Sequence, residues 1–407
     1  MVDTLSRVYT LLFAVGVLLI GHGLQLTLLP LYALSLGWSG TWIGLTGSFY
    51  FIGFAAGCVL VPAIVARVGH IRAFMVMTAV ATVALLLAAV MTSVPAWVLL
   101  RFAIGMALAG LYMIVESWLT DVCPPDRRGG VLSVYLVVSL IGMAVGQLPM
   151  MLVQVSDLRL FILAAVFLAA ASIPVGLTQI ASPRPVPSVR ITPATLIRAS
   201  RVAVVCVVLA GMVTGAFWVL GPVVGREFGL STRQVGLMVS LGILGGAAFQ
   251  YPVGWLSDRF DRRVVIAALA AVGAIVGLLG FLLAGSGDLL LLVSIALLCA
   301  SAMPLYAVCI ALAAERTDLS LVEIASGMLL GHGLGSVLGP MLIAPLTSAF
   351  GPGMFFLVCA LCLLGAATWS LYRFIRIDVP ADGEAHRPML PRTTQAVAEM
   401  IDRDAEP

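Results

Sequence analysis

Twelve long apolar stretches, separated by short polar connections, dominate this sequence of 407 residues. A bilayer core about 30 Å thick needs roughly 20 apolar residues per helical crossing, so each stretch is long enough to span it. Only 10% of the residues are charged and 61% are apolar. Soluble proteins have about 25% charged and 45 to 50% apolar residues. We therefore predict an all-α polytopic membrane protein that contains no large soluble catalytic domain.

The boundaries of the apolar stretches lie at Gly, Pro and charged residues, and they predict twelve transmembrane helices. These helices cover residues 8–31, 41–66, 72–92, 96–120, 130–153, 159–180, 200–224, 233–256, 264–284, 288–313, 322–348 and 353–375. A Pro-rich segment, residues 182–190, separates the sixth span from the seventh. We therefore expect an N-terminal six-helix bundle, a cytoplasmic linker, a C-terminal six-helix bundle and a flexible cytoplasmic tail, in residues 1–180, 181–199, 200–376 and 377–407.

The basic residues, which are all arginines, gather in the connections on one side of the predicted membrane protein. That side carries Arg67, Arg72, Arg127, Arg128, Arg184, Arg190, Arg198, Arg201, Arg259, Arg262, Arg263 and Arg316. The other side carries Arg159, Arg226 and Arg233. Since Lys and Arg are enriched in cytoplasmic loops, both termini are predicted to be cytoplasmic. We expect a multi-pass protein of the bacterial cytoplasmic (inner) membrane.

An internal repeat relates the two halves of the chain. An offset of 192 residues aligns Pro30, Gly37, Ser39, Gly44, Gly53 and Arg67 with Pro222, Gly229, Ser231, Gly236, Gly245 and Arg259. At an offset of 193, Gly142 and Gly146 align with Gly335 and Gly339. Two similar bundles related by an axis along the membrane normal are typical of transporters whose substrate site lies at the interface, near the bilayer midplane.

Residues 254–263, with the sequence GWLSDRFDRR, form the connection between the eighth and ninth spans. This segment resembles the GxxxD(R/K)xGxx(R/K) signature of the major facilitator superfamily, with Asp261 where a second Gly is usual. Residues 62–72 form a degenerate copy in which Ala66 replaces the acidic residue. The resemblance implies the fold of that superfamily, two pseudo-symmetric six-helix bundles, and transport of a small solute by alternating access.

Two further elements agree with this resemblance. Residues 101–105 resemble the RxxxG element of the superfamily, whose Arg is associated with proton coupling, and residues 335–340 resemble its GxxxGP pattern. The combination of Arg101 with residues 115–119 (VESWL) and 304–306 (PLY) is similar to the YcaD-like branch of the superfamily.

The signature segment also suggests a cytoplasmic gate. We expect Asp258 to dock at the N-terminus of the fifth span, where helix-end amides and nearby arginines favour an anion. The predicted gate comprises Gly254, Asp258, Arg259, Arg262, Arg263, Arg127 and Arg128. The alternative is an ordinary solvated loop that obeys the positive-inside rule.

Arg101 and Glu116 are the clearest charged residues inside a predicted span. A charge near the bilayer centre costs at least about 2.5 to 3.5 kcal/mol on insertion scales, so such residues are interpreted as functional. Both lie on one stripe of the fourth span, with Gly105, Leu108 and Tyr112. Because they are separated by about 22 Å of helix, they cannot pair. Glu116 is interpreted as a proton-accepting carboxylate, with snorkelling to the interface as the alternative.

His22 and His332 lie deep within the first and eleventh spans, each between two glycines. Imidazole titrates near neutral pH, so both are candidates for proton coupling together with Arg101 and Glu116, although a buried packing role is equally open. The candidate substrate cavity comprises Gln25, Tyr112, Gln147, Trp218 and Tyr306, for which a structural role is also open.

Several function classes are disfavoured by the sequence. It has no GxxxxGK[ST] loop for a nucleotide, no HExxH or GxSxG motif, and no basic patch with interleaved aromatic residues for nucleic acid. The seven cysteines lack metal-ligand spacing, so we expect neither an enzyme nor a cofactor. The expected partners are a small solute, H⁺ and the lipid bilayer, and the expected state is a monomer. The sequence favours proton-coupled export, with uptake of a small metabolite and a non-transporting sensor as alternatives.

Overall fold

The computed structural model describes residues 2–123, 128–178, 200–317 and 321–376, and these residues fold into helices and short turns with no strand among them. Twelve helical segments within these residues are long and apolar enough to cross a membrane. The predicted all-α architecture with twelve spans is therefore confirmed. The predicted linker, residues 181–199, and the predicted tail, residues 377–407, lie outside the described residues.

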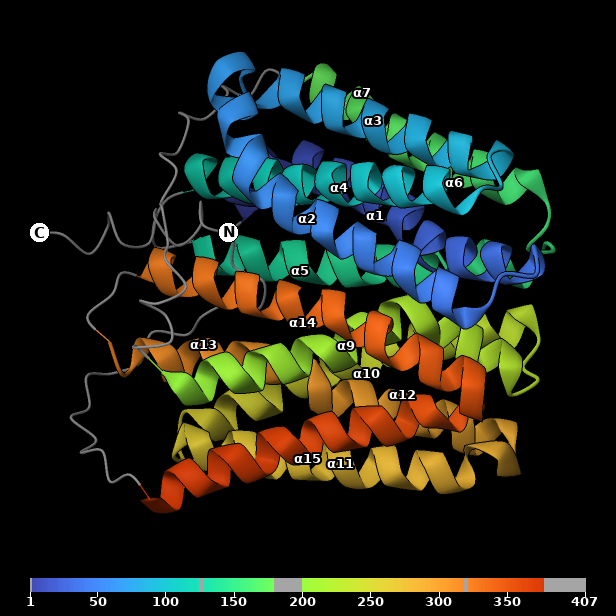
Figure 1. The fold of residues 1–407 in the computed structure, drawn as a ribbon. Coiled ribbons are helices and arrows are strands. Elements are labelled where there is room, and N and C mark those ends of the chain that lie inside the picture. Colours follow the sequence, from blue (N-terminus) through green and yellow to red (C-terminus); the bar gives the residue numbers. More distant parts are fainter. Residues whose placement is uncertain (1, 124–127, 179–199, 318–320, 377–407) are drawn as a thin grey trace, which may run out of the picture.

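The first half of the chain provides six spans, which lie together in the upper part of Figure 1. The helices are α1 (Val2–Ser35), α2 (Gly40–Val68), α3 (His70–Val90), α4 (Val94–Val122), α5 (Arg128–Val145) with the short 3₁₀ helix η2 (Leu148–Met151), and α6 (Leu158–Ala170) with α7 (Ser172–Gly176).

The second half provides the other six spans, in the lower part of the same view. Its helices are α9 (Arg201–Glu227), α10 (Thr232–Ser257), α11 (Arg262–Leu283) with the 3₁₀ helix η3 (Ala284–Ser286), α12 (Asp288–Ala302) with α13 (Leu305–Ala314), α14 (Leu321–Phe350) and α15 (Gly353–Arg376).

The tenth span is broken between α12 and α13. The break falls at Met303 and Pro304, and Pro304 is the N-cap residue of α13. Met303 and Pro304 both keep helical backbone angles, but proline has no backbone N–H, so the helical hydrogen-bond pattern is interrupted there. Tyr306 therefore follows directly after a discontinuity in the span.

Glycines allow the first helix of each half to approach the fifth helix of that half closely. In the first half, a Cβ atom on Gly146 would collide with the backbone carbonyl of Ile20 in α1. In the second half, a Cβ atom on Gly335 would collide in the same way with Val208 in α9. Small residues are the usual means by which membrane helices pack, because lipid provides no hydrophobic driving force for their association.

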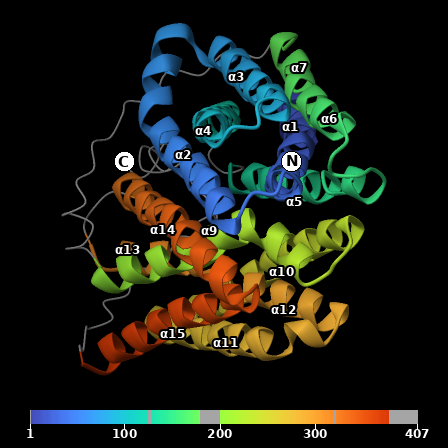
Figure 2. The ribbon, with the colours of Figure 1, turned by 45° about the vertical axis from the view of Figure 1, so that its right-hand side comes forward.

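The ends of the molecule differ in charge. The basic end is defined by residues 67–72, 257–263 and 373–376, and the opposite end by residues 35–40, 227–232 and 350–353. At the opposite end α2 and α14 lie against each other, and they diverge toward the basic end (Figures 1 and 2).

Contacts at the opposite end join the two halves directly. Ser48 of α2 donates a hydrogen bond to the carbonyl oxygen of Val337 in α14, at 2.8 Å. A Cβ atom on Gly44 would lie 2.8 Å from the carbonyl oxygen of Pro340. Gly236 of α10 faces the backbone of Gln147, where a Cβ atom would lie 3.3 Å from the carbonyl oxygen. The halves therefore meet backbone to backbone at this end.

Replacing Gly335 with Val tests the close approach of α14 to α9. The added side chain has no space beside Val208, so we expect destabilisation of about 1 to 3 kcal/mol, the usual cost of overpacking. Gly333→Val is the matched control, because a Cβ atom on Gly333 would have nothing within 4 Å. Thermal unfolding of the purified proteins in detergent measures the difference, and equal melting temperatures for the two variants would contradict this packing.

Candidate functional site

A polar cluster lies between α1, α2 and α4 in the first half, with His22 midway along its span and Arg101 nearer to the start of α4. His22 is 3% exposed, and Gln25, which has no exposed surface, lies with its Nε2 2.9 Å from Nδ1 of His22. The imidazole stacks on Tyr50 with 6.3 Å between ring centroids, and it meets the edge of Tyr112 at 6.1 Å. The guanidinium of Arg101 lies over the Tyr50 ring, 5.1 Å from its centroid. The structure thus brings together four residues that were expected from the sequence. Tyr50 links them, because it contacts both His22 and Arg101.

Arg101 is 3% exposed, its Nη1 has no hydrogen-bond partner among the described residues, and it takes part in none of their ion pairs. A crevice between α1, α2 and α4 reaches this side chain, and Thr46 and Trp97 are among its lining residues. Removing a guanidinium from water without an anionic partner is costly, at least about 2.5 to 3.5 kcal/mol at the centre of a membrane helix. The face of Tyr50 offsets part of this cost by a cation–π contact, which is worth about 0.5 to 2 kcal/mol.

Glu116 lies on the same helix as Arg101 but nearer to the basic end. Its side chain is 4% exposed, and the hydroxyl of Tyr135 in α5 donates a hydrogen bond to its Oε1 at 3.1 Å. The side chain is therefore turned into the protein and does not snorkel to the interface. Tyr135 was not identified from the sequence, because a lone Tyr in an apolar run does not differ from a packing residue.

A second polar cluster lies in the second half, on α9, α13 and α14. Nε2 of His332 is 3.0 Å from Oγ1 of Thr214, and its Nδ1 is 3.5 Å from Oγ of Ser336. The imidazole also meets the ring of Tyr306 edge-on, at 5.1 Å between centroids. His332 and Tyr306 were expected, whereas Thr214 and Ser336 were missed. The repeat could have indicated Thr214, because it is 192 residues after His22.

The two clusters are related by the internal repeat but differ in charge. Thr214 lies midway along its span, as His22 does, and Tyr306 follows Tyr112 by 194 residues on the equivalent span. In each half a His ring meets a Tyr ring edge-on, but His22 lies on the first span of its half and His332 on the fifth, so the two histidines are not equivalent in the repeat. The arginine is present only in the first cluster, since the residue 192 positions after Arg101 is Val293.

The remaining two candidates for the cavity have different surroundings. Gln147 is fully buried, and its Nε2 donates to the carbonyl oxygen of Gly23 at 2.8 Å, which links α5 to α1. Trp218 of α9 is half-buried and lies against Phe217 with 5.1 Å between ring centroids.

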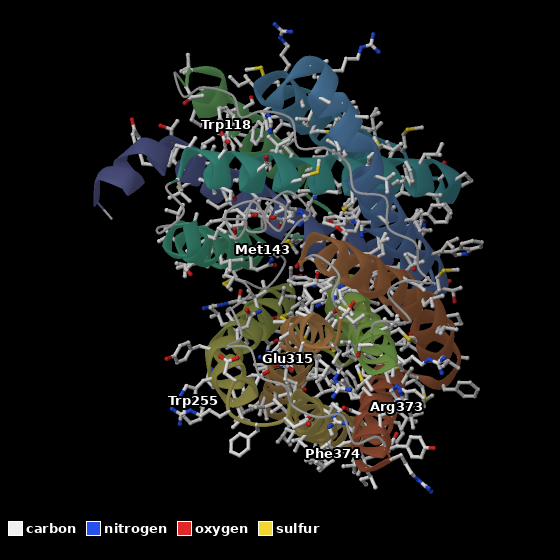
Figure 3. The ribbon with its side chains drawn as sticks, turned by 90° about the vertical axis from the view of Figure 1, so that its left-hand side faces the viewer. Trp118, Met143, Trp255, Glu315, Arg373 and Phe374 are labelled. Carbon is white, nitrogen blue, oxygen red and sulfur yellow. The ribbon has the colours of Figure 1, made fainter. Side chains whose placement is uncertain are left out.

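The arginines of the signature segment form a network that holds the second half together at the basic end. The side chain of Arg262 is 4% exposed. Its Nε donates to Oε1 of Glu315 at 2.6 Å, its Nη1 to Oγ of Ser257 at 2.8 Å, and its Nη2 to Oδ1 of Asp258 at 3.4 Å. Arg262 thereby connects α10, α11 and the end of α13. Figure 3 views this end of the molecule, with Glu315 within the second half.

Arg263 extends the network to α15. Its guanidinium donates to Asp261 at 2.7 Å and lies 4.9 Å from the centre of the Phe374 ring. Burial tends to raise the pKa of the Asp261 carboxyl, but the hydrogen bonds and charge of Arg263 outweigh burial and hold that pKa below its ordinary value. This contact therefore stabilises the folded state above about pH 4 and is lost as the pH falls through the lowered pKa.

The other members of the predicted gate lie at the surface or outside the described residues. Arg259 is exposed and lies 3.9 Å from the centre of the Trp255 ring, and the neighbouring Gly254 is half-buried. Asp258 is half-exposed and bonds to Arg262 as described. Arg127 and the side chain of Arg128 lie outside the described residues. Docking of Asp258 at the start of α5 stays a prediction.

The equivalent position in the first half carries a histidine. His70 precedes Arg262 by 192 residues and is 2% exposed, and its Nε2 lies 3.3 Å from Oγ of Ser117 in α4. The repeat therefore places an imidazole ring where the second half holds a permanently charged guanidinium.

Replacing Arg262 with Met tests the network at the basic end. Removal of the guanidinium leaves Ser257 and Glu315 without their donor, so we expect a loss of about 1 to 3 kcal/mol of stability. Arg259→Met, on the exposed neighbour, is expected to change stability by less than about 1 kcal/mol. Both are measured by thermal unfolding in detergent, and an equal effect of the two substitutions would show that the network adds no stability.

Comparison with known proteins agrees with the fold and the motifs. The chain is 26% identical over 363 residues to the uncharacterized MFS-type transporter Ent638_1421 of Enterobacter sp. (strain 638), in an alignment that covers 88% of this chain and 94% of that protein. It is 28% identical over 342 residues to the uncharacterized MFS-type transporter YcaD of Escherichia coli (strain K12 / DH10B), over 82% of this chain and 87% of the relative. The resemblance to the YcaD-like branch is thereby confirmed.

A solved structure shares the same architecture. The crystal structure of the nucleoside transporter NupG superposes with a TM-score of 0.71 at 16% identity, over 90% of this chain and 98% of that one. The family model of the Major Facilitator Superfamily matches residues 11–201 and 203–398. This chain therefore belongs to the major facilitator superfamily of membrane transporters.

Proposed function

We propose that this protein is a proton-coupled secondary transporter that exports a small solute across the bacterial cytoplasmic membrane. In this proposal both termini and the basic end face the cytoplasm, as the distribution of arginines favours. The two bundles, residues 1–180 and 200–376, act as the units that rock against each other. Export is favoured because most of the cavity candidates are aromatic or uncharged.

The buried contact between Glu116 and Tyr135 carries the proposal of proton coupling. A carboxyl group that is 4% exposed within a membrane helix is costly unless it has a function or a partner. Tyr135 donates to it from a neighbouring helix, so the two side chains report on the relative position of α4 and α5. Exchange of a proton at Glu116 would change this contact and so link protonation to helix movement.

The packing of the halves supports alternating access. The halves are joined at the opposite end through Ser48 and Val337, while α2 and α14 diverge toward the basic end. This arrangement is the one expected for a transporter whose site is accessible from the cytoplasm. Docking of Asp258 at the start of α5 would then belong to the state in which the basic end is closed.

The proposed substrate site lies between the two His–Tyr clusters. His22 and Thr214 are midway along their spans, and the break at Pro304 places Tyr306 near the same level. Interrupted helices near the midplane are a common feature of transporter substrate sites.

Substitution of Glu116 by Gln tests the proton-coupling proposal. In proteoliposomes that contain a pH-sensitive dye, a panel of small solutes is offered under an imposed pH gradient. We expect the wild type to show solute-dependent proton movement, and Glu116→Gln to reduce it at least tenfold while solute exchange without a gradient persists. Tyr135→Phe is expected to reduce solute-dependent proton movement as well, because the hydrogen bond that joins Glu116 to α5 is lost.

Glu227→Gln is the matched control, since this carboxyl is exposed at the opposite end of α9. It should transport as the wild type does. Proton movement in Glu116→Gln equal to that of the wild type would refute the proposal. The direction of proton movement separates export by exchange from uptake by symport, and ligand binding without any flux would indicate a sensor.

A further inference from the structure

The guanidinium of Arg101 is a buried cation that has no ion pair with the described residues. Its side chain is 3% exposed and lies over the face of Tyr50, and within the described residues its Nη1 has no hydrogen-bond acceptor. Glu116 is fifteen residues farther along α4, about 22 Å at 1.5 Å per residue, so it cannot supply the counter-charge.

The surroundings of Arg101 enclose its charge. The crevice between α1, α2 and α4 beside Arg101 has no room for a water molecule in this structure, and its walls include apolar residues such as Leu29 and Trp97. Thr46, its polar neighbour there, already donates its hydroxyl proton to the carbonyl oxygen of Ile43 at 3.0 Å. A solute therefore reaches Arg101 only when these helices move apart, and it then meets a single positive charge in an apolar wall.

The expected charge of the solute follows from the distribution of buried charge between the two halves. One guanidinium balances one negative charge, and the repeat places Val293 at the equivalent position of the second half. The second cluster offers groups that form hydrogen bonds, on Thr214, His332 and Ser336. A planar guanidinium matches the two oxygens of a carboxylate better than it matches a spherical ion.

We infer that Arg101 binds the carboxylate of the transported solute, which is therefore a small monocarboxylate with hydrogen-bonding groups on its remaining part. This inference rests on the proposed function and names its substrate class. The cation–π contact with Tyr50 holds the guanidinium while the crevice is empty, and the carboxylate completes its pairing.

Thermal unfolding of the purified full-length protein tests the inference. Lactate replaces chloride one for one at constant ionic strength and pH 7, and lactamide is the uncharged counterpart of the same shape. We expect lactate to raise the Tm of the wild type by at least about 2 °C and lactamide to leave it unchanged. Arg101→Gln should lose the shift, and Arg101→Lys should show less than half of it.

Arg159→Gln is the matched control, because this arginine is exposed at the opposite end and pairs with Asp157. It should respond to lactate as the wild type does. Three results would each overturn the inference: no difference between lactate and chloride in the wild type, an equal response to lactamide, or an undiminished response in Arg101→Gln. If Arg101→Gln does not fold, an undiminished response in Arg101→Lys overturns it instead.

The outcomes also separate this inference from the proposed function. A lactate response that depends on Arg101, without proton-driven solute movement in proteoliposomes, would refute the proposed function and keep the anion site. Proton-driven movement of uncharged solutes that is unaffected by Arg101→Gln would refute the inference alone.

Discussion

Close contact between helix backbones is the constraint on which this structure depends. The hydrophobic effect does not drive helices together inside a bilayer, so they associate through van der Waals contact and a few hydrogen bonds. At Gly146 and Gly335 the fifth helix of each half touches the first, and at Gly44 one half touches the other. Close backbone contact therefore holds each bundle together and also joins the two halves at the opposite end. The polar clusters fill the space that this packing leaves for longer side chains.

Charged residues are scarce in this chain, so the few that are buried stand out. The second half uses its buried arginines, Arg262 and Arg263, to fasten helix ends together, and both have acidic partners. The first half instead holds Arg101 and Glu116 apart on one helix, each beside a tyrosine from another helix. The two halves share a sequence repeat but differ in their buried charges. In the second half the buried arginines join helices, whereas in the first half Arg101 and Glu116 lie far apart on one helix.

The sequence was sufficient for the twelve spans, because long apolar runs have few alternatives in a membrane. It also located Arg101 and Glu116, because charge stands out against such runs. Tyr50 and Tyr135 could not be predicted as their partners, since an aromatic residue in an apolar helix gives no sign of which neighbour it faces. Glu315 was missed because it lies at a helix end, where an acidic residue is ordinary, and only the fold brings it to Arg262.

The two ends of the molecule are held by different forces. At the opposite end the halves meet through small residues and the hydrogen bond from Ser48 to a backbone carbonyl, whereas the basic end carries the ionic network around Arg262. Dissolved salt screens charges but has little influence on contacts between neutral backbones. Ionic strength therefore acts on the exposed members of that network, Asp258 and Glu315, more than on the neutral contacts that join the halves at the opposite end.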